Sequence, residues 1–204
     1  QVGEQSLNIG RNAVLAAGWP ETVPATTIDR QCGSSQQSAH FAAQGVIAGA
    51  YDIVVAAGVE VMTTTPMGAS VIPGSIPFGP KVMERYDLVP QGIAAEMIAD
   101  QWGLSREDLD AFGAESQRRA AQARDEGRFD NDIIPVVSKI RDKETGEVKV
   151  LDSMHTRDEG IRPGTTLESL GGLRPAFDGD GTITAGNASQ ISDGAAAVVV
   201  MSKA

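Results

Sequence analysis

Ile28-Asp29-Arg30-Gln31-Cys32-Gly33-Ser34-Ser35 joins a β-branched segment, residues 23–29, to a run of small residues that is expected to form a helix. Cys32 is the only cysteine among the 204 residues, and it lies at this strand-to-helix junction. Unpaired backbone N–H groups at a helix N-terminus stabilise a thiolate, so the position suits a nucleophile. The alternative is a small buried residue, which is the more common role of a free cysteine.

The residues after the junction favour a closely packed helix. Gly33 permits close approach of the backbone to a ligand, and Ser34 or Ser35 can cap the helix. Alanine dominates residues 38–48, so the helix can be buried on nearly all sides. Gly49 is expected to end it as a C-terminal cap.

Composition excludes several classes of protein. The formal net charge of -10 disfavours nonspecific binding to nucleic acid and to anionic membranes. The longest apolar runs, residues 53–59 and 195–201, are too short to cross a bilayer. One cysteine rules out an intramolecular disulfide and fits a reducing compartment, so a cytoplasmic location is expected. His40 and His155 lie far apart without metal-ligand spacing, so no metal site is expected.

The order of the expected elements is typical of a layered α/β fold. A helix over residues 5–17 is followed by the strand over 23–29 and by the helix after the cysteine. Residues 52–59 and 195–201 are continuously apolar, which predicts strands buried on both faces of a central parallel or mixed sheet.

A long insertion separates these last two strands. It is too long for a loop, so it is expected to be a subdomain with its own role. Two helices are expected inside it, over residues 92–102 and 105–127, the second with Ser105 as N-cap and Asp108 in a capping box. The expected division is a core, an inserted subdomain and a return to the core sheet, at residues 1–62, 63–184 and 185–204.

Each helix of the insertion has an apolar side that is expected to face the core. These apolar residues are Ile93, Met97 and Ile98 in the first helix, and Leu109, Phe112 and Ala120 in the second. A two-stranded ribbon is expected over residues 133–137 and 146–150, with Pro135 favouring an edge position. The next three arginines, if they cluster, can bind an anionic ligand; otherwise they are separate solvated side chains. They are Arg157, Arg162 and Arg174.

Several motifs follow one another along nearly the whole chain. They are Cys32-Gly33-Ser34-Ser35, the segment from Asp52 to Glu60, Gln101-Trp102-Gly103-Leu104-Ser105-Arg106, Leu173-Arg174-Pro175-Ala176-Phe177, Thr184-Ala185-Gly186-Asn187-Ala188-Ser189 and Asp193-Gly194-Ala195-Ala196. In this order the chain resembles the thiolase family, the acetyl-CoA acetyltransferases and 3-ketoacyl-CoA thiolases. The resemblance implies an α/β fold, a layered thiolase-type N-terminal domain. Its partial mixed sheet would be flanked by helices, and an inserted α+β loop subdomain would cover coenzyme A.

The resemblance also implies a reaction and its residues. Cys32 would be the acyl-accepting nucleophile, which attacks a thioester carbonyl to form an acyl-enzyme that a second thiol releases. The residues expected to contact coenzyme A are Arg162, Phe177, Ala185 and Ser189. The arginine can pair with phosphate, the phenylalanine offers an apolar wall, and the serine can bond the amides of the pantetheine arm. Coenzyme A and acyl-CoA are then substrates without a covalently bound cofactor, and the complete enzyme is expected to be a homo-oligomer, a dimer or tetramer.

Two departures from the family pattern carry further expectations. Pro90-Gln91-Gly92 stands where many thiolases have His-Met-Gly at the mouth of the acyl pocket, which favours longer or bulkier 3-ketoacyl groups. The family's Gly-His-Pro motif with the catalytic histidine, its Asn-Glu oxyanion motif and its Cys-x-Gly-x-Gly motif do not occur. The chain is therefore expected to be most of an N-terminal domain, without its first strand and helix and without the C-terminal domain. It is expected to be an inactive half when alone.

Two other functions fit the same residues. A non-catalytic coenzyme A-binding or assembly subunit would keep the fold and contribute an interface to a partner chain. A decarboxylating condensing enzyme of the ketosynthase type shares a cysteine junction, but the loop over residues 187–194 and the insertion favour a thiolase.

Overall fold

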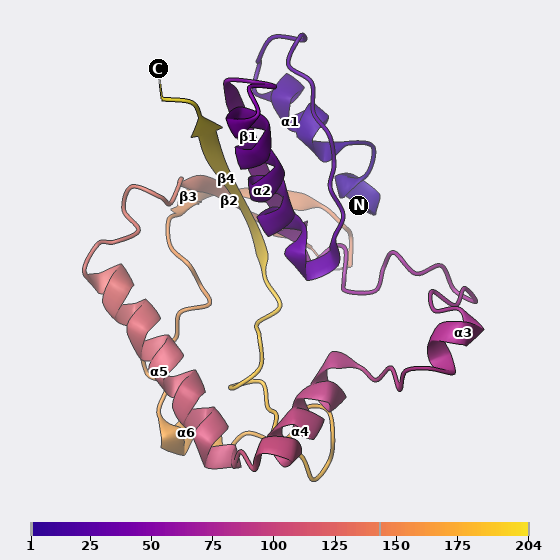
Figure 1. Cartoon of the computed structure of the whole chain (residues 1–204). Coiled ribbons are helices and arrows are strands. Elements are labelled where there is room, and N and C mark those ends of the chain that lie inside the picture. The colour runs from indigo at the N-terminus through magenta and orange to yellow at the C-terminus, as the bar shows by residue number, and fades with distance from the viewer. Residues whose placement is uncertain (1, 143, 204) are drawn as a thin grey trace. The chain divides into compact units, whose positions relative to one another are not determined.

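The computed structural model describes residues 2–142 and 144–203, which form two compact units. The first unit comprises residues 2–85 and 191–203, with the 3₁₀ helices η1 (Gly3–Gln5) and η2 (Gln31–Gly33), the helices α1 (Ile9–Ala16), α2 (Ser34–Ile47) and α3 (Pro80–Met83), and the strands β1 (Ile53–Val61) and β4 (Asp193–Met201). The second unit, Tyr86–Gln190, contains the helices α4 (Gln91–Trp102), α5 (Arg106–Asp125) and α6 (Leu167–Gly171) and the strands β2 (Val136–Arg141) and β3 (Val148–His155) (Figure 1). The structure thus divides the chain at residues 86 and 190, whereas the sequence pattern places the insertion at 63–184. Within the described residues, every helix is too short or too polar to span a membrane.

Strands β1 and β4 form the sheet of the first unit. They pair antiparallel, from Ile53 opposite Met201 to Val61 opposite Asp193. Just beyond β1, the backbone N–H and the hydroxyl of Thr63 donate to the Asp193 carboxylate at 3.0 and 2.6 Å, which ties the end of one strand to the start of the other. Helix α2 packs against both strands (Figure 1).

Alternate residues of β1 face helix α2. Ala56 is buried, and Gly58 lies so close to the helix that a β carbon there would fall 2.6 Å from the Ser35 hydroxyl oxygen. On the other face, Ile53 and Val199 are 63% and 60% exposed. The described strands are therefore antiparallel and covered on one face, whereas their unbroken apolar sequences favoured strands covered on both faces of a parallel or mixed sheet.

Residues 23–29 form no strand in the described structure. Side chains of the first turn of α1 and of its N-cap bind two carbonyl groups of this segment instead. Arg11 donates to the Val23 carbonyl, and Asn8 donates to the Ala25 carbonyl at 2.8 Å. Because its carbonyl groups are satisfied by side chains, the segment differs from the strand that its β-branched residues predict.

Helices α4 and α5 confirm the two helices expected in the insertion. Helix α5 begins after Ser105, whose hydroxyl accepts the Asp108 N–H while the Asp108 carboxylate accepts the Ser105 N–H, which completes the capping box. The expected apolar sides are partly wrong, because Phe112 is 80% exposed and the buried residues include the carboxylates of Glu96 and Asp110. Buried carboxylates require hydrogen-bond partners, and these two find theirs in the loop after α6.

Strands β2 and β3 form the expected two-stranded ribbon. Its first strand begins later than predicted, since the Ile133 N–H bonds to the Phe129 carbonyl at 3.0 Å in a turn, and Pro135 precedes the strand. Helices and strands in both units give the chain the expected α/β class.

Candidate functional site

Cys32 lies in the 3₁₀ turn η2, immediately before helix α2, and its side chain is exposed and free of any disulfide. The preceding residue, Gln31, adopts a left-handed backbone conformation with φ of 50°, which is uncommon for a residue with a side chain. The Asp29 carboxylate accepts the Gln31 N–H at 3.2 Å and so supports this turn. An exposed thiol contradicts the alternative in which Cys32 is a buried packing residue.

Ser34 stabilises the turn that contains Cys32. It does not cap the helix, so this expected role is not found. Its hydroxyl accepts the Arg30 N–H at 2.9 Å and donates to the Gln31 carbonyl at 2.7 Å. The N-cap position of α2 is Gly33, which supplies no capping side chain. The helix therefore begins beside the thiol without a side-chain cap, an arrangement in which its first N–H groups can stabilise a nearby negative charge.

A cavity of about 510 Å³ lies within the second unit. It is lined by Phe112, Gly113, Ser116 and Gln117 of α5, by Arg162, Thr165, Leu170 and Leu173, and by the loop from Ala185 to Gln190. Three of the four residues expected to contact coenzyme A, namely Arg162, Ala185 and Ser189, line this one cavity although 27 residues separate the first from the last. Of the three arginines for which a cluster and separate solvated side chains were both open, Arg162 alone is among the lining residues.

Two glutamines fix the backbone around Arg162. Gln117 accepts the Arg162 N–H at 2.7 Å and donates to the Gly160 carbonyl at 3.3 Å. Gln190 donates to the same carbonyl at 2.9 Å and accepts from the Arg162 guanidinium at 3.1 Å. The arginine is exposed at the cavity, and the Gln190 amide oxygen orients its guanidinium. Among the residues that the structure describes, no carboxylate pairs with this guanidinium, so its charge is available to an anionic ligand.

The loop that carries Ala185 and Ser189 is held by close backbone approach. A β carbon on Gly113 of α5 would fall 2.7 Å from the Gly186 carbonyl oxygen. A β carbon on Gly186 would overlap the side chain of Leu170, at 2.4 Å. Glycine is therefore required at both positions to bring the loop against α5 and α6.

Glu96 anchors the same loop from helix α4. Its carboxylate accepts the Thr182 N–H, the Thr182 hydroxyl and the Ile183 N–H, each at 2.8 Å. Burial alone would raise the pKa of Glu96, but these hydrogen bonds outweigh it and hold the pKa below its ordinary value. The carboxylate therefore remains charged and acts as a fixed acceptor for the loop.

Phe177 does not line this cavity; its ring lies against the first turn of helix α4. A β carbon on Gly92 would fall 2.1 Å from the Phe177 ring, so the ring covers this glycine, and its outer side is half-exposed. The structure thus brings a residue expected to contact coenzyme A onto Pro90-Gln91-Gly92, the segment expected at the acyl pocket.

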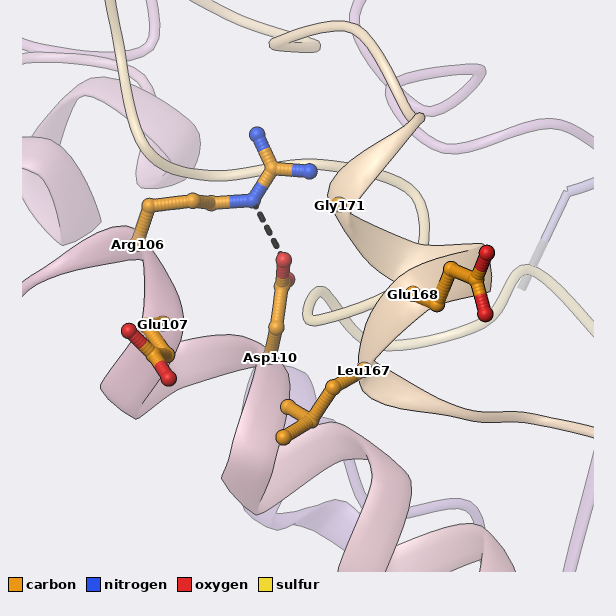
Figure 2. A pocket seen from close by; sticks show the side chains of 6 residues that line it. All are labelled: Arg106, Glu107, Asp110, Leu167, Glu168 and Gly171. Carbon is orange, nitrogen blue, oxygen red and sulfur yellow. Dashed lines mark hydrogen bonds and ion pairs between the residues drawn. The ribbon is translucent and has the colours of Figure 1, made fainter.

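A second, smaller cavity of about 390 Å³ also lies within the second unit. Figure 2 shows its lining residues, Arg106, Glu107, Asp110, Leu167, Glu168 and Gly171. The Arg106 guanidinium and the Asp110 carboxylate are paired at 2.7 Å. Because this pair is neutral overall and two further carboxylates line the cavity, it suits a phosphate-bearing ligand less than the cavity at Arg162 does.

Sequence reasoning missed the residues that shape the larger cavity, which are Glu96, Asp110, Gln117, Asn187 and Gln190. Usable signals existed for Asn187, which lies in the motif Thr184-Ala185-Gly186-Asn187-Ala188-Ser189, and for Glu96, which interrupts the apolar side of its helix one residue before Met97. The glutamines lie in a polar helix and a polar loop, where nothing distinguishes them from solvated side chains.

The chain is similar to proteins of one family. A family profile described as "Thiolase, N-terminal domain" matches residues 1–204. The 3-ketoacyl-CoA thiolase of Bacillus subtilis (strain 168) is 45% identical over 98% of this chain and 51% of that protein. The peroxisomal 3-ketoacyl-CoA thiolase 2 of Arabidopsis thaliana is 44% identical over 98% of this chain and 43% of that protein. The chain spans about half the length of these curated relatives.

Two solved structures have a similar fold. The dimeric peroxisomal thiolase of Saccharomyces cerevisiae matches with a TM-score of 0.79 and 37% identity, over 96% of this chain and 49% of that chain. Human mitochondrial 3-ketoacyl-CoA thiolase, solved in complex with CoA, matches with a TM-score of 0.79 and 31% identity, over 100% of this chain and 51% of that chain.

Proposed function

The chain belongs to the thiolase family, and on this premise we propose that Cys32 is the acyl-accepting nucleophile of a 3-ketoacyl-CoA thiolase. The thiolate attacks the 3-keto carbonyl carbon of a 3-ketoacyl-CoA, the bond between C2 and C3 breaks, C2 takes up a proton and leaves as acetyl-CoA, and the acyl group stays on the sulfur. The thiol of coenzyme A then attacks this thioester, so that the shortened acyl-CoA leaves and the Cys32 thiol is restored. A covalent intermediate divides one difficult exchange into two easier steps. Support comes from the exposed thiol and from the uncapped start of α2 beside it.

Coenzyme A is proposed to bind in the cavity of the second unit. The observation that carries this proposal is that Arg162, Ala185 and Ser189, chosen from the sequence alone, line the same cavity. In this arrangement the guanidinium pairs with phosphate, and the serine hydroxyl and the loop backbone bond the amides of the pantetheine arm. Phe177 offers an apolar wall beside Gly92, where the family has its acyl pocket, and this supports a preference for longer or bulkier 3-ketoacyl groups.

Assembly and location remain predictions. We expect the complete enzyme to be a dimer or tetramer, and the related yeast protein is described as dimeric. The relatives include peroxisomal and bacterial proteins, so the cytoplasmic location is a prediction from the single cysteine alone.

The binding part of the proposal is tested by titrating the chain with coenzyme A in a calorimeter. Arg162→Ala removes the cation at the cavity and is expected to weaken binding by about ten-fold or more, the value of a charged hydrogen bond. Arg157→Ala is the matched control, because it removes the same charge from a nearby residue that does not line the cavity. Equal affinities of the two variants would contradict the proposed site.

The catalytic part is tested by the reactivity of the thiol. Because Cys32 is the only cysteine, intact mass after iodoacetamide treatment reports its alkylation alone. The folded chain is expected to react faster at neutral pH than the same chain unfolded in urea, because the thiol is exposed beside the uncapped N–H groups at the start of α2. A slower folded chain that still binds coenzyme A would instead favour a non-catalytic coenzyme A-binding subunit.

Turnover is a separate test. The isolated chain, given acetoacetyl-CoA and coenzyme A, is expected to show little thiolysis because the family's histidine motif does not occur in it. Thiolysis at ordinary enzymatic rates would show that the chain contains its own base.

A further inference from the structure

We infer that Asp110 is a positioning residue for the coenzyme A cavity: its buried carboxylate couples the two sides of the cavity and sets the shape of the loop that carries Ala185 and Ser189. This inference rests on the proposed function, because it concerns the same cavity. No motif pointed to Asp110, which lies between Leu109 and Ala111 near the start of helix α5.

Asp110 is 2% exposed and uses each of its oxygens for a different side of the cavity. One oxygen accepts from Arg106 Nε at 2.7 Å, and the same guanidinium donates to the Leu170 and Leu173 carbonyls at 2.7 and 3.0 Å. Leu170 and Leu173 both line the cavity. The other oxygen accepts from Asn187 Nδ2 at 3.0 Å, on the opposite loop.

Asn187 transmits this contact to the backbone of the loop. Its Nδ2 also donates to the Thr182 carbonyl at 3.0 Å, and its side-chain oxygen accepts the Thr184 N–H at 2.8 Å. Thr184 is completely buried, and its hydroxyl in turn accepts the Gly186 N–H at 3.1 Å. The asparagine therefore has its orientation fixed at three points, and Asp110 supplies the one that comes from outside the loop.

Only a carboxylate meets both demands at this position. Arg106 and Asn187 both present N–H donors to Asp110, so two acceptor oxygens are needed. In Asp110→Asn one oxygen becomes an NH₂ group, which must face one of the two donors, so one contact breaks while the size of the side chain is kept. Breaking either contact releases one side of the cavity.

The test compares coenzyme A affinity in Asp110→Asn with that in Glu115→Gln. Glu115 lies on the same helix and is paired with Arg118 and Arg119, but it does not line the cavity. Both substitutions remove one negative charge, which by itself favours an anionic ligand. Weaker binding in Asp110→Asn alone would therefore oppose the charge effect and isolate the positioning role.

We expect Asp110→Asn to weaken coenzyme A binding by about ten-fold and Glu115→Gln to leave it unchanged or slightly tighter. A loss of global stability alone leaves the fitted Kd unchanged as long as the variant stays predominantly folded, which urea unfolding of the variant checks. Asn187→Ala, which keeps the buried Arg106 pair, provides a second variant and is expected to weaken binding similarly. In the double variant, the loss of coenzyme A affinity is expected to be smaller than the sum of the two single losses, because both substitutions act on the contact between Asp110 and Asn187.

Amide hydrogen exchange gives a readout that needs no ligand. The Thr184 amide is expected to exchange at least about ten-fold faster in Asp110→Asn, while amides of β4 keep the wild-type rate. Unchanged exchange at Thr184, or a Kd within about two-fold of wild type in the folded variant, would overturn the inference. A wild-type chain that does not bind coenzyme A would count against the proposed function, and the exchange of Thr184 would still decide whether Asp110 holds the loop.

Discussion

Replacing Glu96 by glutamine is expected to destabilise the second unit by about 2 kcal/mol. The wild-type carboxylate accepts two hydrogen bonds from Thr182 and one from the Ile183 N–H. Glutamine keeps the shape but has one acceptor oxygen, and its NH₂ group must face a donor. The Thr182 hydroxyl can rotate to accept from that group, whereas a backbone N–H cannot.

Either orientation of the glutamine therefore leaves one backbone N–H, that of Thr182 or of Ile183, without its partner. A hydrogen bond to a charged group contributes about 1.5–3 kcal/mol, and leaving a buried donor unsatisfied costs a similar amount. Glutamine also avoids the cost of burying a charge, which offsets part of this loss. The value of about 2 kcal/mol is the balance of these effects.

The assay must report the second unit alone, because a chain with two units need not unfold in one step. The chain has two tryptophans, Trp19 in the first unit and Trp102 at the end of α4. In a Trp19→Phe background, the fluorescence of Trp102 in urea follows the unit that contains Glu96. Asp100→Asn, an exposed carboxylate on the same helix, is the control and is expected to change stability by less than about 0.5 kcal/mol.

The effect of Glu96→Gln should depend on pH in a known direction. Because hydrogen bonds hold the pKa of Glu96 below its ordinary value of 4.5, the wild-type carboxylate stabilises the folded state fully above that value. This contribution is lost as the pH falls below 4.5 towards the folded-state pKa, so the two proteins should approach each other in stability. A difference below about 0.5 kcal/mol at neutral pH, or one that widens on acidification, would refute the reasoning.

Three further substitutions test packing and helix capping inside each unit separately. Gly113→Ala is expected to cost about 1–3 kcal/mol in urea unfolding, because its β carbon would meet the Gly186 carbonyl oxygen at 2.7 Å and backbone cannot easily yield. Gly58→Ala is expected to lower the melting temperature through its contact with Ser35, and Ser35→Gly in the same chain is expected to restore part of the loss; no restoration would locate the strain elsewhere. Ser105→Ala removes the N-cap of α5 and is expected to cost about 1 kcal/mol by urea unfolding, and an unchanged midpoint would mean that the cap contributes nothing.

Local signals in the sequence predicted the helices well. Ser105 and Asp108 located the start of α5 because capping is a short-range interaction between neighbouring residues. Gly49, with φ of 70°, ends the helix after Cys32 as expected, since a left-handed residue after a helix favours glycine. These features depend on a few consecutive residues, so they can be read without knowledge of the fold.

Long-range interactions escaped the sequence pattern. The β-branched residues 23–29 fit a strand, yet Arg11 and Asn8 bind their carbonyl groups, and no propensity reports such a contact. Glu96 and Asp110 are charged residues that propensity assigns to the surface, yet they are buried because the loop supplies donors to them. The cavity was partly anticipated, since the family resemblance selected Arg162, Ala185 and Ser189, but of the groups that shape it only Asn187 lies within a family motif.

The pairing of β1 with β4 has a consequence for biosynthesis. Asp193 follows Thr63 by 130 residues, so at about 5–20 residues per second a ribosome needs on the order of ten seconds to deliver β4 after β1 has emerged. The whole second unit is translated within that interval, so its internal contacts can form before β1 has its partner strand. During this interval β1 has emerged and β4 has not, so the nascent chain exposes an unpaired apolar strand. An unpaired strand edge can pair with other chains, so this is the stage at which chaperone binding would prevent most aggregation.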